Sequence, residues 1–190
     1  TVTGTATTTT DYTITSSPVT ISAGSTTTTA TITIVSDTLD ENNETVILTM
    51  GTPTNASQGS TTVHTATITD DDSAPTVTLS RSAASMSETG GAATVTATLS
   101  AASGLDVTVN LSYSGTATVT DDYTRSASSI TISAGSTTGT VTLTAVSDAL
   151  DENDETIITD ISSVSNGTES GTQQQTVTIT DDDATPTVAW

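Results

Sequence analysis

The chain has 190 residues and a formal net charge of −20, because 22 acidic residues stand against only two basic ones. Nucleic acids and anionic membranes are bound through basic patches, so this charge excludes both as partners of this segment. Only 32% of the residues are hydrophobic and 2% aromatic, which predicts a lean core of Val, Ile, Leu and Ala. The absence of Cys excludes disulfide bonds, so a bound metal ion is the remaining means of reinforcing small domains.

The sequence contains an internal repeat with an offset of 111 positions (148 − 37 and 181 − 70). Residues 20–27 return unchanged as residues 131–138, and no insertion or deletion separates the copies. A period of this length is the size of an independently folding domain rather than of a solenoid unit. Other matched segments are residues 4–6 with 115–117, 11–13 with 122–124, and 75–77 with 186–188.

The repeat predicts three segments. Residues 1–73 form a partial copy that lacks the counterpart of residues 75–111, residues 74–185 form a complete copy, and residues 186–190 begin a further one. Two interpretations of the partial copy stay open. The chain is either an excerpt from a longer array, or a subunit whose first domain is completed by a strand from a neighbour, as in β-augmentation.

Alternation of Thr with aliphatic residues predicts strands along the whole chain. A period of two residues is typical of half-buried strands, and Thr suits an exposed strand face. Turn signals separate the strands at Gly24, Gly90, Gly135 and Asn166-Gly167. About seven short strands per period and no amphipathic helix predict an all-β fold of tandem immunoglobulin-like antiparallel sandwiches. The clearest predicted strands cover residues 29–34, 94–99, 107–111, 139–144 and 176–180.

Each copy carries the same two acidic clusters. Residues 36–44 recur as residues 147–155, and the runs Asp70-Asp71-Asp72 and Asp181-Asp182-Asp183 follow them. Ca²⁺ takes six to eight oxygen ligands, so one run is too short and several loops must converge. Carboxylates packed together without a cation repel one another, which raises their pKa values. Acidic runs are often only solvated loops, but the recurrence of both clusters favours a metal site.

The ordered motifs resemble the Calx-beta domain, a module of sodium–calcium exchangers, an integrin tail and large bacterial surface proteins. The resemblance covers nearly the whole chain. It rests on Asp-Tyr, on Ile-x-Ala-Gly-x-Thr, on Ser-Asp-x-x-x-Glu-x-x-Glu-Thr and on Thr-Ile-x-Asp-Asp-Asp, each present twice. The Thr-rich and Lys-poor style is closest to the bacterial adhesin members. The resemblance implies tandem β-sandwiches that bind Ca²⁺ at the end of each sandwich that faces the next domain.

The resemblance also implies the ligands. In the complete copy they are Glu88, Asp122, Asp148, Glu152, Glu155, Asp181, Asp182 and Asp183, with a backbone carbonyl from Leu150. In the partial copy they are Asp11, Asp37, Glu41, Glu44, Asp70, Asp71 and Asp72, with Leu39 in the place of Leu150. The partial copy has no counterpart of Glu88 within this chain. The family often has an Asp just before Asp148, where this sequence has Ser147.

Catalysis is not expected. His64 is the only His and has Gln175 at the matching position, so we expect it on a strand surface. Paired carboxylates can serve glycoside hydrolysis, but the chain has one Trp and three Tyr and so lacks aromatic platforms for a sugar. Tyr12 and Tyr123 are expected to pack inside the sandwich.

Three functions are compatible with the sequence. The first is a Ca²⁺-stiffened stalk of an extracellular or cell-surface bacterial adhesin. Its partners are then neighbouring repeats of the same or an identical chain. Any host, surface or glycan target is bound by another part of the full protein. The second is a subunit of an extracellular filament, assembled by strand complementation between neighbouring repeats. The third is an ice- or glycan-binding module with a Thr face. The repeated acidic clusters favour the first.

Overall fold

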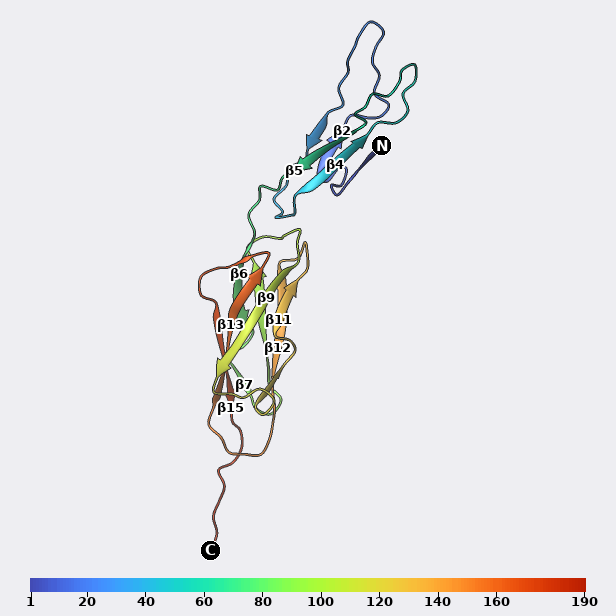
Figure 1. Ribbon diagram of the computed structural model, residues 1–190. Coiled ribbons are helices and arrows are strands. Elements are labelled where there is room, and N and C mark those ends of the chain that lie inside the picture. The colour runs from blue at the N-terminus through green and yellow to red at the C-terminus, as the bar shows by residue number, and fades with distance from the viewer. The chain divides into compact units, whose positions relative to one another are not determined.

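The computed structural model describes residues 1–190 and contains strands but no α-helix (Figure 1). None of its elements is therefore a helix of the length and apolarity that crossing a bilayer requires. The chain divides into two compact units, residues 1–72 and residues 73–190, which we call unit 1 and unit 2. The all-β prediction is confirmed.

Unit 2 is a sandwich of two five-stranded sheets. Neighbouring strands are antiparallel except for two short parallel pairs, β14 with β6 and β15 with β7. The first sheet has the order β10-β12-β8-β6-β14, with β6 (Thr76–Arg81), β8 (Ala92–Leu99), β10 (Tyr123–Arg125), β12 (Thr138–Ala145) and β14 (Thr168–Glu169). The second has the order β11-β9-β13-β15-β7, with β7 (Ser85–Ser87), β9 (Val107–Gly115), β11 (Ser129–Ile132), β13 (Glu155–Ser165) and β15 (Gln174–Thr180).

The core of unit 2 lies between these sheets and is aliphatic, as the composition predicts. Along β8 the aliphatic residues from Ala93 to Leu99 are buried and the Thr residues between them are only partly covered. Burial of each Val or Leu side chain stabilises the folded state by about 1.5–3 kcal/mol, so a stable core without large aromatic residues needs many such positions. Tyr123 packs among them with 2% of its surface exposed, and its counterpart Tyr12 in unit 1 is equally buried.

Unit 1 repeats only the later part of this fold. One of its sheets has the order β1-β4-β5 and the other pairs β2 with β3. The registers agree across the repeat, since Tyr12 pairs with Ile34 as Tyr123 pairs with Ala145. The strands are β1 (Val2–Gly4), β2 (Tyr12–Ile14), β3 (Ile32–Ile34), β4 (Glu44–Thr49) and β5 (Val63–Ile68).

The strand predicted at residues 29–34 is shorter in the structure and covers only Ile32–Ile34. The physical reason is visible in unit 2, where residues 138–142 pair with residues 98–94 of β8. No counterpart of β8 lies within residues 1–72, so residues 27–31 have no partner strand. Residues 186–190 also form no strand within this chain, and their role as the start of a further repeat stays a prediction.

Candidate metal centre

The predicted ligands of unit 2 come from the ends of strands that meet at one edge of the sandwich. Glu88 follows β7, Asp181 follows β15, and Glu155 is the first residue of β13. Asp122 directly precedes β10, whose first residue pairs with the last residue of β12. Asp148 lies three residues beyond that end of β12. Because β13 runs antiparallel to β15 and β7 runs parallel to β15, the start of β13 lies at the same edge as the ends of β15 and β7.

Carboxylates from both sheets line one cavity at this edge. Two groups of three are close enough to share a cation, since the ligand oxygens within each group all lie within 4.8 Å of one another. The first group is Asp122, Glu152 and Glu155, and the second is Glu88, Asp182 and Asp183. The full lining of the cavity is Glu88, Asp122, Val146, Asp148, Glu152, Asn153, Glu155, Ile179 and Asp181.

Backbone N–H groups and hydroxyls hold several of these carboxylates in place. The N–H of Asp148 donates to Oε1 of Glu88 at 3.1 Å, which joins loops from the two sheets. The N–H of Leu150 donates to Oδ1 of Asp148 at 2.7 Å, and the hydroxyl of Ser87 donates to Oδ2 of Asp182 at 3.3 Å. These hydrogen bonds fix the positions of the Glu88, Asp148 and Asp182 carboxylates but leave other oxygens of the site free to bind a cation.

One oxygen in the centre needs a partner that the protein does not provide. Oδ1 of Asp181 is buried and accepts no hydrogen bond. A buried carboxylate oxygen without a partner is costly unless it meets a donor or a metal ion. Carboxylates dominate the donor set of the cavity, which contains no Lys, Arg, His or Cys. Such a set fits a hard cation of the Ca²⁺ type.

The crowding of negative charge raises the pKa of several of these carboxyl groups. Burial, a hydrogen bond that protonated Glu155 donates to Asp122, and the charge of Asp122 together raise the pKa of Glu155 to about 7. Burial, followed by the charge of Asp148, raises the pKa of Glu152. For Glu88, the Asp148 N–H lowers the pKa, but burial and the neighbouring carboxylates outweigh that bond and raise it. A divalent cation would reverse the sign of these interactions.

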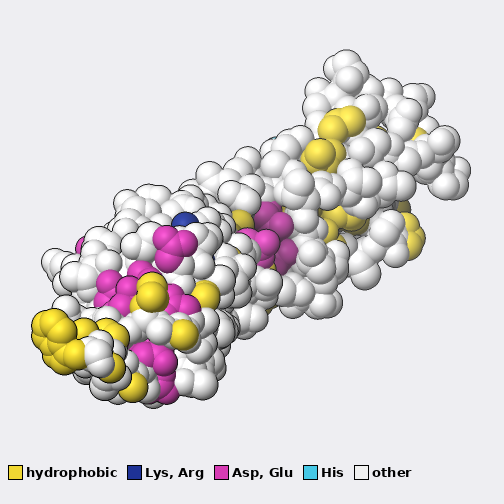
Figure 2. Space-filling model, turned by 90° about the horizontal axis from the view of Figure 1, so that it is seen from below, with side chains coloured by type: hydrophobic (Ala, Val, Ile, Leu, Met, Phe, Trp, Pro, Cys, Tyr) yellow, Lys and Arg dark blue, Asp and Glu magenta, His cyan; other side chains and the backbone are white.

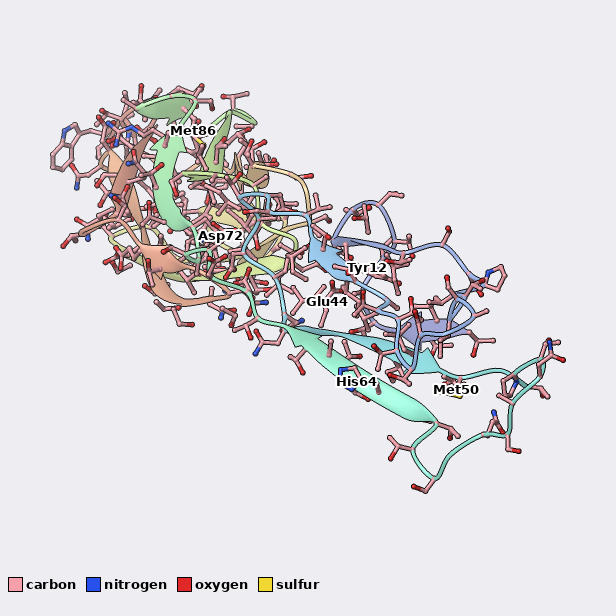
Figure 3. All side chains as sticks on the ribbon, turned by 90° about the horizontal axis from the view of Figure 1, so that it is seen from above. Tyr12, Glu44, Met50, His64, Asp72 and Met86 are labelled. Carbon is pink, nitrogen blue, oxygen red and sulfur yellow. The ribbon has the colours of Figure 1, made fainter.

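Unit 1 has the corresponding acidic site. Oδ1 of Asp37 accepts the N–H of Leu39 at 2.9 Å, as Asp148 does from Leu150. Glu44 and Asp72 lie toward the same end of the unit, whereas Met50 lies near the far end of β4 (Figure 3). Burial and neighbouring carboxylates raise the pKa of Glu41, Glu44 and Asp72. The cavity is lined by Asp11, Ile34, Val35, Ser36, Asp37, Leu39, Glu41, Asn42, Glu44, Ile68, Thr69, Asp70, Asp71 and Asp72.

The structure brings most of the predicted ligands together. All of those predicted in unit 1 line its cavity. In unit 2, Leu150 is 61% exposed and does not line the cavity, unlike its counterpart Leu39. Asp182 and Asp183 group with Glu88 instead of lining the same cavity as Asp181. Whether each of these residues binds metal stays a prediction.

Sequence reasoning missed the amide residues of the site. Asn153 lines the cavity of unit 2 and Asn42 that of unit 1. Asn43 accepts the N–H of Asp70 at 2.9 Å, as Asp154 accepts that of Asp181 at 3.3 Å. Asn42 and Asn153 lie 111 positions apart within the acidic motif, so their recurrence in the repeat could have indicated that both belong to the site. An amide oxygen is also a suitable Ca²⁺ ligand.

Figure 2 shows Asp and Glu side chains gathered in patches, with almost no basic side chain on the face seen. Arg125 lies 4.3 Å from the centre of the Tyr113 ring, and neither Arg81 nor Arg125 lines the cavity of unit 2. The acidic centres therefore depend on protons, water or a bound cation for charge compensation.

Known protein families and solved structures include matches to this chain. No curated protein sequence matches the chain significantly. Among solved structures 13 chains match, including the apo-form Calx CBD1 domain, which is 19% identical with a TM-score of 0.47 and covers 57% of this chain and 99% of that chain. The sequence matches the Calx-beta domain over residues 1–72 and again over residues 70–183. Calx-beta domains are non-catalytic β-sandwich domains that bind Ca²⁺. The chain belongs to the Calx-beta domain family.

Proposed function

We propose that this chain is a non-enzymatic, Ca²⁺-binding structural repeat of an extracellular bacterial surface protein, where bound Ca²⁺ stiffens an extended adhesin-like stalk. The observation that carries the proposal is the convergence of carboxylates around the unpartnered, buried Oδ1 of Asp181. The same acidic set recurs in unit 1, as expected for tandem modules that use one metal-binding design.

Two groups of side chains would hold the ions in unit 2. Asp122, Glu152 and Glu155 form one group, and Glu88 with Asp182 and Asp183 forms the other. Bound Ca²⁺ supplies positive charge that offsets the repulsion among these carboxylates. The protein supplies the carboxylate oxygens that bind the ions. Backbone N–H groups already orient two of these carboxylates, those of Glu88 and Asp148.

The position of the acidic runs in the sequence supports the stiffening role. Asp70, Asp71 and Asp72 are the last residues of unit 1, and unit 2 begins at Ser73. A cation held by this run restricts the chain directly before the link between units. Without the cation, repulsion among these carboxylates favours a loosened end of unit 1, and burial together with the same repulsion raises the pKa of Asp72.

Calorimetric titration of the full chain with CaCl₂ tests the binding. We expect the wild-type chain to bind Ca²⁺. The Glu155→Gln variant should bind it with an affinity that is lower by roughly tenfold or more, because loss of a residue close to a bound metal lowers metal affinity by at least that factor. Asp160→Asn is the matched control, since it removes one charge from the same strand outside the cavity. Absence of heat with the wild-type chain, or equal weakening by both variants, would contradict the proposal.

Stiffening is tested separately by a distance measurement. The chain contains no Cys, so a spin label can be placed on each unit through Ser60→Cys and Ser133→Cys, both at exposed positions. We expect Ca²⁺ to narrow the distribution of distances between the labels. A distribution of unchanged width would leave a Ca²⁺ site without a mechanical role.

A further inference from the structure

In unit 2 the hydrogen-bonded ladder between β13 and β15 ends beside the acidic cavity. Its last pair joins Glu155, the first residue of β13, to Ile179. On its other side, β15 bonds to the two residues that flank β7 through the N–H of Thr178 and the carbonyl of Thr180. Backbone groups of successive residues in a strand point to opposite sides, so Ile179 and Asp181 direct their N–H groups toward β13. The N–H of Asp181 therefore points to the place where β13 has already ended.

The side chain of Asp154 accepts this N–H. Asp154 directly precedes β13, and its Oδ1 accepts the N–H of Asp181 at 3.3 Å across 27 positions of sequence. The loop of residues 147–155 is thus tied to the run Asp181-Asp182-Asp183 by one bond beyond the last strand pair. Asp154 is exposed and does not line the cavity, whereas the residues on either side of it do. Asp154 therefore contacts the backbone of a proposed ligand and lies outside the site itself.

Unit 1 contains the same bond at the same place, made by a different side chain. The ladder between β4 and β5 ends at Glu44 and Ile68, the positions that match the last pair of unit 2. One residue before β4, Oδ1 of Asn43 accepts the N–H of Asp70 at 2.9 Å. An amide oxygen thus serves as well as a carboxylate oxygen. The bond is common to both copies and does not require a negative charge.

The bond fixes the start of the terminal acidic run. Asp181 lines the cavity, and its buried Oδ1 accepts no hydrogen bond. The next two residues, Asp182 and Asp183, form a group of carboxylates with Glu88. A fixed Asp181 backbone therefore directs its unpartnered oxygen into the cavity and sets the point from which Asp182 and Asp183 reach the second group.

We propose that Asp154 is a positioning residue of the Ca²⁺ centre in unit 2, and that Asn43 has the same part in unit 1. Each side chain extends the ladder between two strands by one bond and so orients the first carboxylate of the terminal acidic run. The role depends on an oxygen acceptor and not on charge. It rests on the proposed Ca²⁺ function, whereas the hydrogen bond exists without a cation. Loss of a residue that orients metal ligands typically lowers metal affinity by about 10–100-fold.

Amide hydrogen exchange of the full chain in chelator tests the bond itself. We expect slow exchange at Asp181 in the wild-type chain and in Asp154→Asn, which keeps an oxygen acceptor, and fast exchange in Asp154→Ala. Asn43→Ala should speed exchange at Asp70 and leave Asp181 unchanged. Because Asp154 and Asn43 are exposed, these variants keep the fold, and unchanged exchange in the core strands verifies it. Equal exchange at Asp181 in all the proteins would overturn the proposal.

Titration of the same proteins with CaCl₂ tests the role in metal binding. Amide resonances of unit 2, followed by NMR, separate its binding from that of unit 1. We expect Asp154→Ala to bind Ca²⁺ in unit 2 roughly tenfold more weakly or worse, and Asp154→Asn to bind almost as tightly as the wild-type chain. Asp151→Ala is the matched control and should stay close to wild type. It removes a carboxylate from the same loop, at an exposed position that does not line the cavity.

The outcomes separate this role from the Ca²⁺ function on which it rests. Wild-type affinity in Asp154→Ala would overturn the proposal. Equal losses in Asp154→Ala and Asp154→Asn, or in Asp154→Ala and Asp151→Ala, would also overturn it, because charge and not position would then set the affinity. These results leave the Ca²⁺ function intact, since the wild-type chain still binds. No response of wild-type unit 2 to CaCl₂ would contradict the Ca²⁺ function, and this role with it, whatever the exchange at Asp181 shows.

Discussion

The N–H of Asp148 donates a 3.1 Å hydrogen bond to Oε1 of Glu88, 60 positions earlier in the chain. The bond joins the loop after β12 in one sheet to the end of β7 in the other, at the edge where the carboxylates gather. Glu88 is only 6% exposed, so its carboxylate is directed into the protein rather than into solvent. This contact fixes the orientation of the Glu88 carboxylate, a proposed Ca²⁺ ligand, without the help of a cation.

The Glu88→Gln variant should show that Glu88 matters for Ca²⁺ affinity and not for the stability of the metal-free fold. The Gln side chain keeps an oxygen that can accept the Asp148 N–H but removes one negative charge from the centre. We expect unchanged or higher stability in chelator and Ca²⁺ affinity that is lower by roughly tenfold. Calorimetric titration and chemical unfolding measure the two quantities. Glu169→Gln is the control, because Glu169 lies outside the cavity and its oxygen also accepts a backbone N–H. Equal Ca²⁺ affinity of Glu88→Gln and wild type would exclude Glu88 as a ligand.

The metal-free protein should become less stable as the pH rises. The pKa of Glu155 is raised from 4.5 to about 7 in the folded chain, so between these values the folded state holds more protons than the unfolded state. The contribution of Glu155 to the free energy of unfolding is therefore fully present below about pH 4.5, and this contribution is lost as the pH rises through 7. Urea unfolding in chelator at several pH values measures this trend, which Glu155→Gln should flatten. Stability that rises over the same range would contradict the raised pKa.

Thr159→Val should stabilise unit 2. Thr159 is 0% exposed in β13, and its hydroxyl has no hydrogen-bond partner. Removing a buried hydroxyl that has no partner recovers its desolvation cost, about 1 kcal/mol or more, at nearly constant shape. Chemical unfolding measures the gain. Thr180→Val is the comparison, because the Thr180 hydroxyl donates to the carbonyl of Met86 and its loss should destabilise. A loss of stability in Thr159→Val would mean that its hydroxyl is bonded after all.

Gly115→Ala should destabilise unit 2 more than Gly135→Ala does. Both glycines have positive φ, 117° and 78°, so any side chain adds strain of about 1–2 kcal/mol. At Gly115 an added Cβ would also lie 2.1 Å from the carbonyl oxygen of Thr156, whereas at Gly135 it would meet nothing within 4 Å. Comparison of the unfolding free energies of the two variants checks this difference. Equal losses would show that the close approach at Gly115 relaxes without cost.

Much of unit 2 could be predicted from local patterns. Alternation of Thr with aliphatic residues correctly indicates β8, β9, β12 and β15, and the matched glycines and Asn166 indicate turns that do have positive φ. His64 is exposed on β5, as its lack of a repeat partner suggested. These features depend on residues close together in sequence, which is why the sequence alone reveals them.

What the sequence could not predict depends on contacts between residues far apart in the chain. Residues 29–31 alternate like a strand, but a strand needs a hydrogen-bonded neighbour, and the one that unit 2 uses is absent from residues 1–72. The different exposure of Leu39 and Leu150 is likewise invisible in two nearly identical motifs. The grouping of Asp182 and Asp183 with Glu88 depends on how three loops pack, which spacing along the chain does not encode.

Thermal unfolding of the full chain, in millimolar Ca²⁺ and in chelator, tests the central claim most directly. The variant for comparison is Asp122→Asn/Glu155→Gln, which removes two charges from one carboxylate group. At 100 times the dissociation constant, ligand binding stabilises the folded state by about 2.7 kcal/mol. We predict a clear Ca²⁺-dependent rise in the melting temperature of the wild-type chain that is lost in the variant. Identical melting of both proteins in both conditions would mean that the acidic clusters are solvated loops and not metal sites.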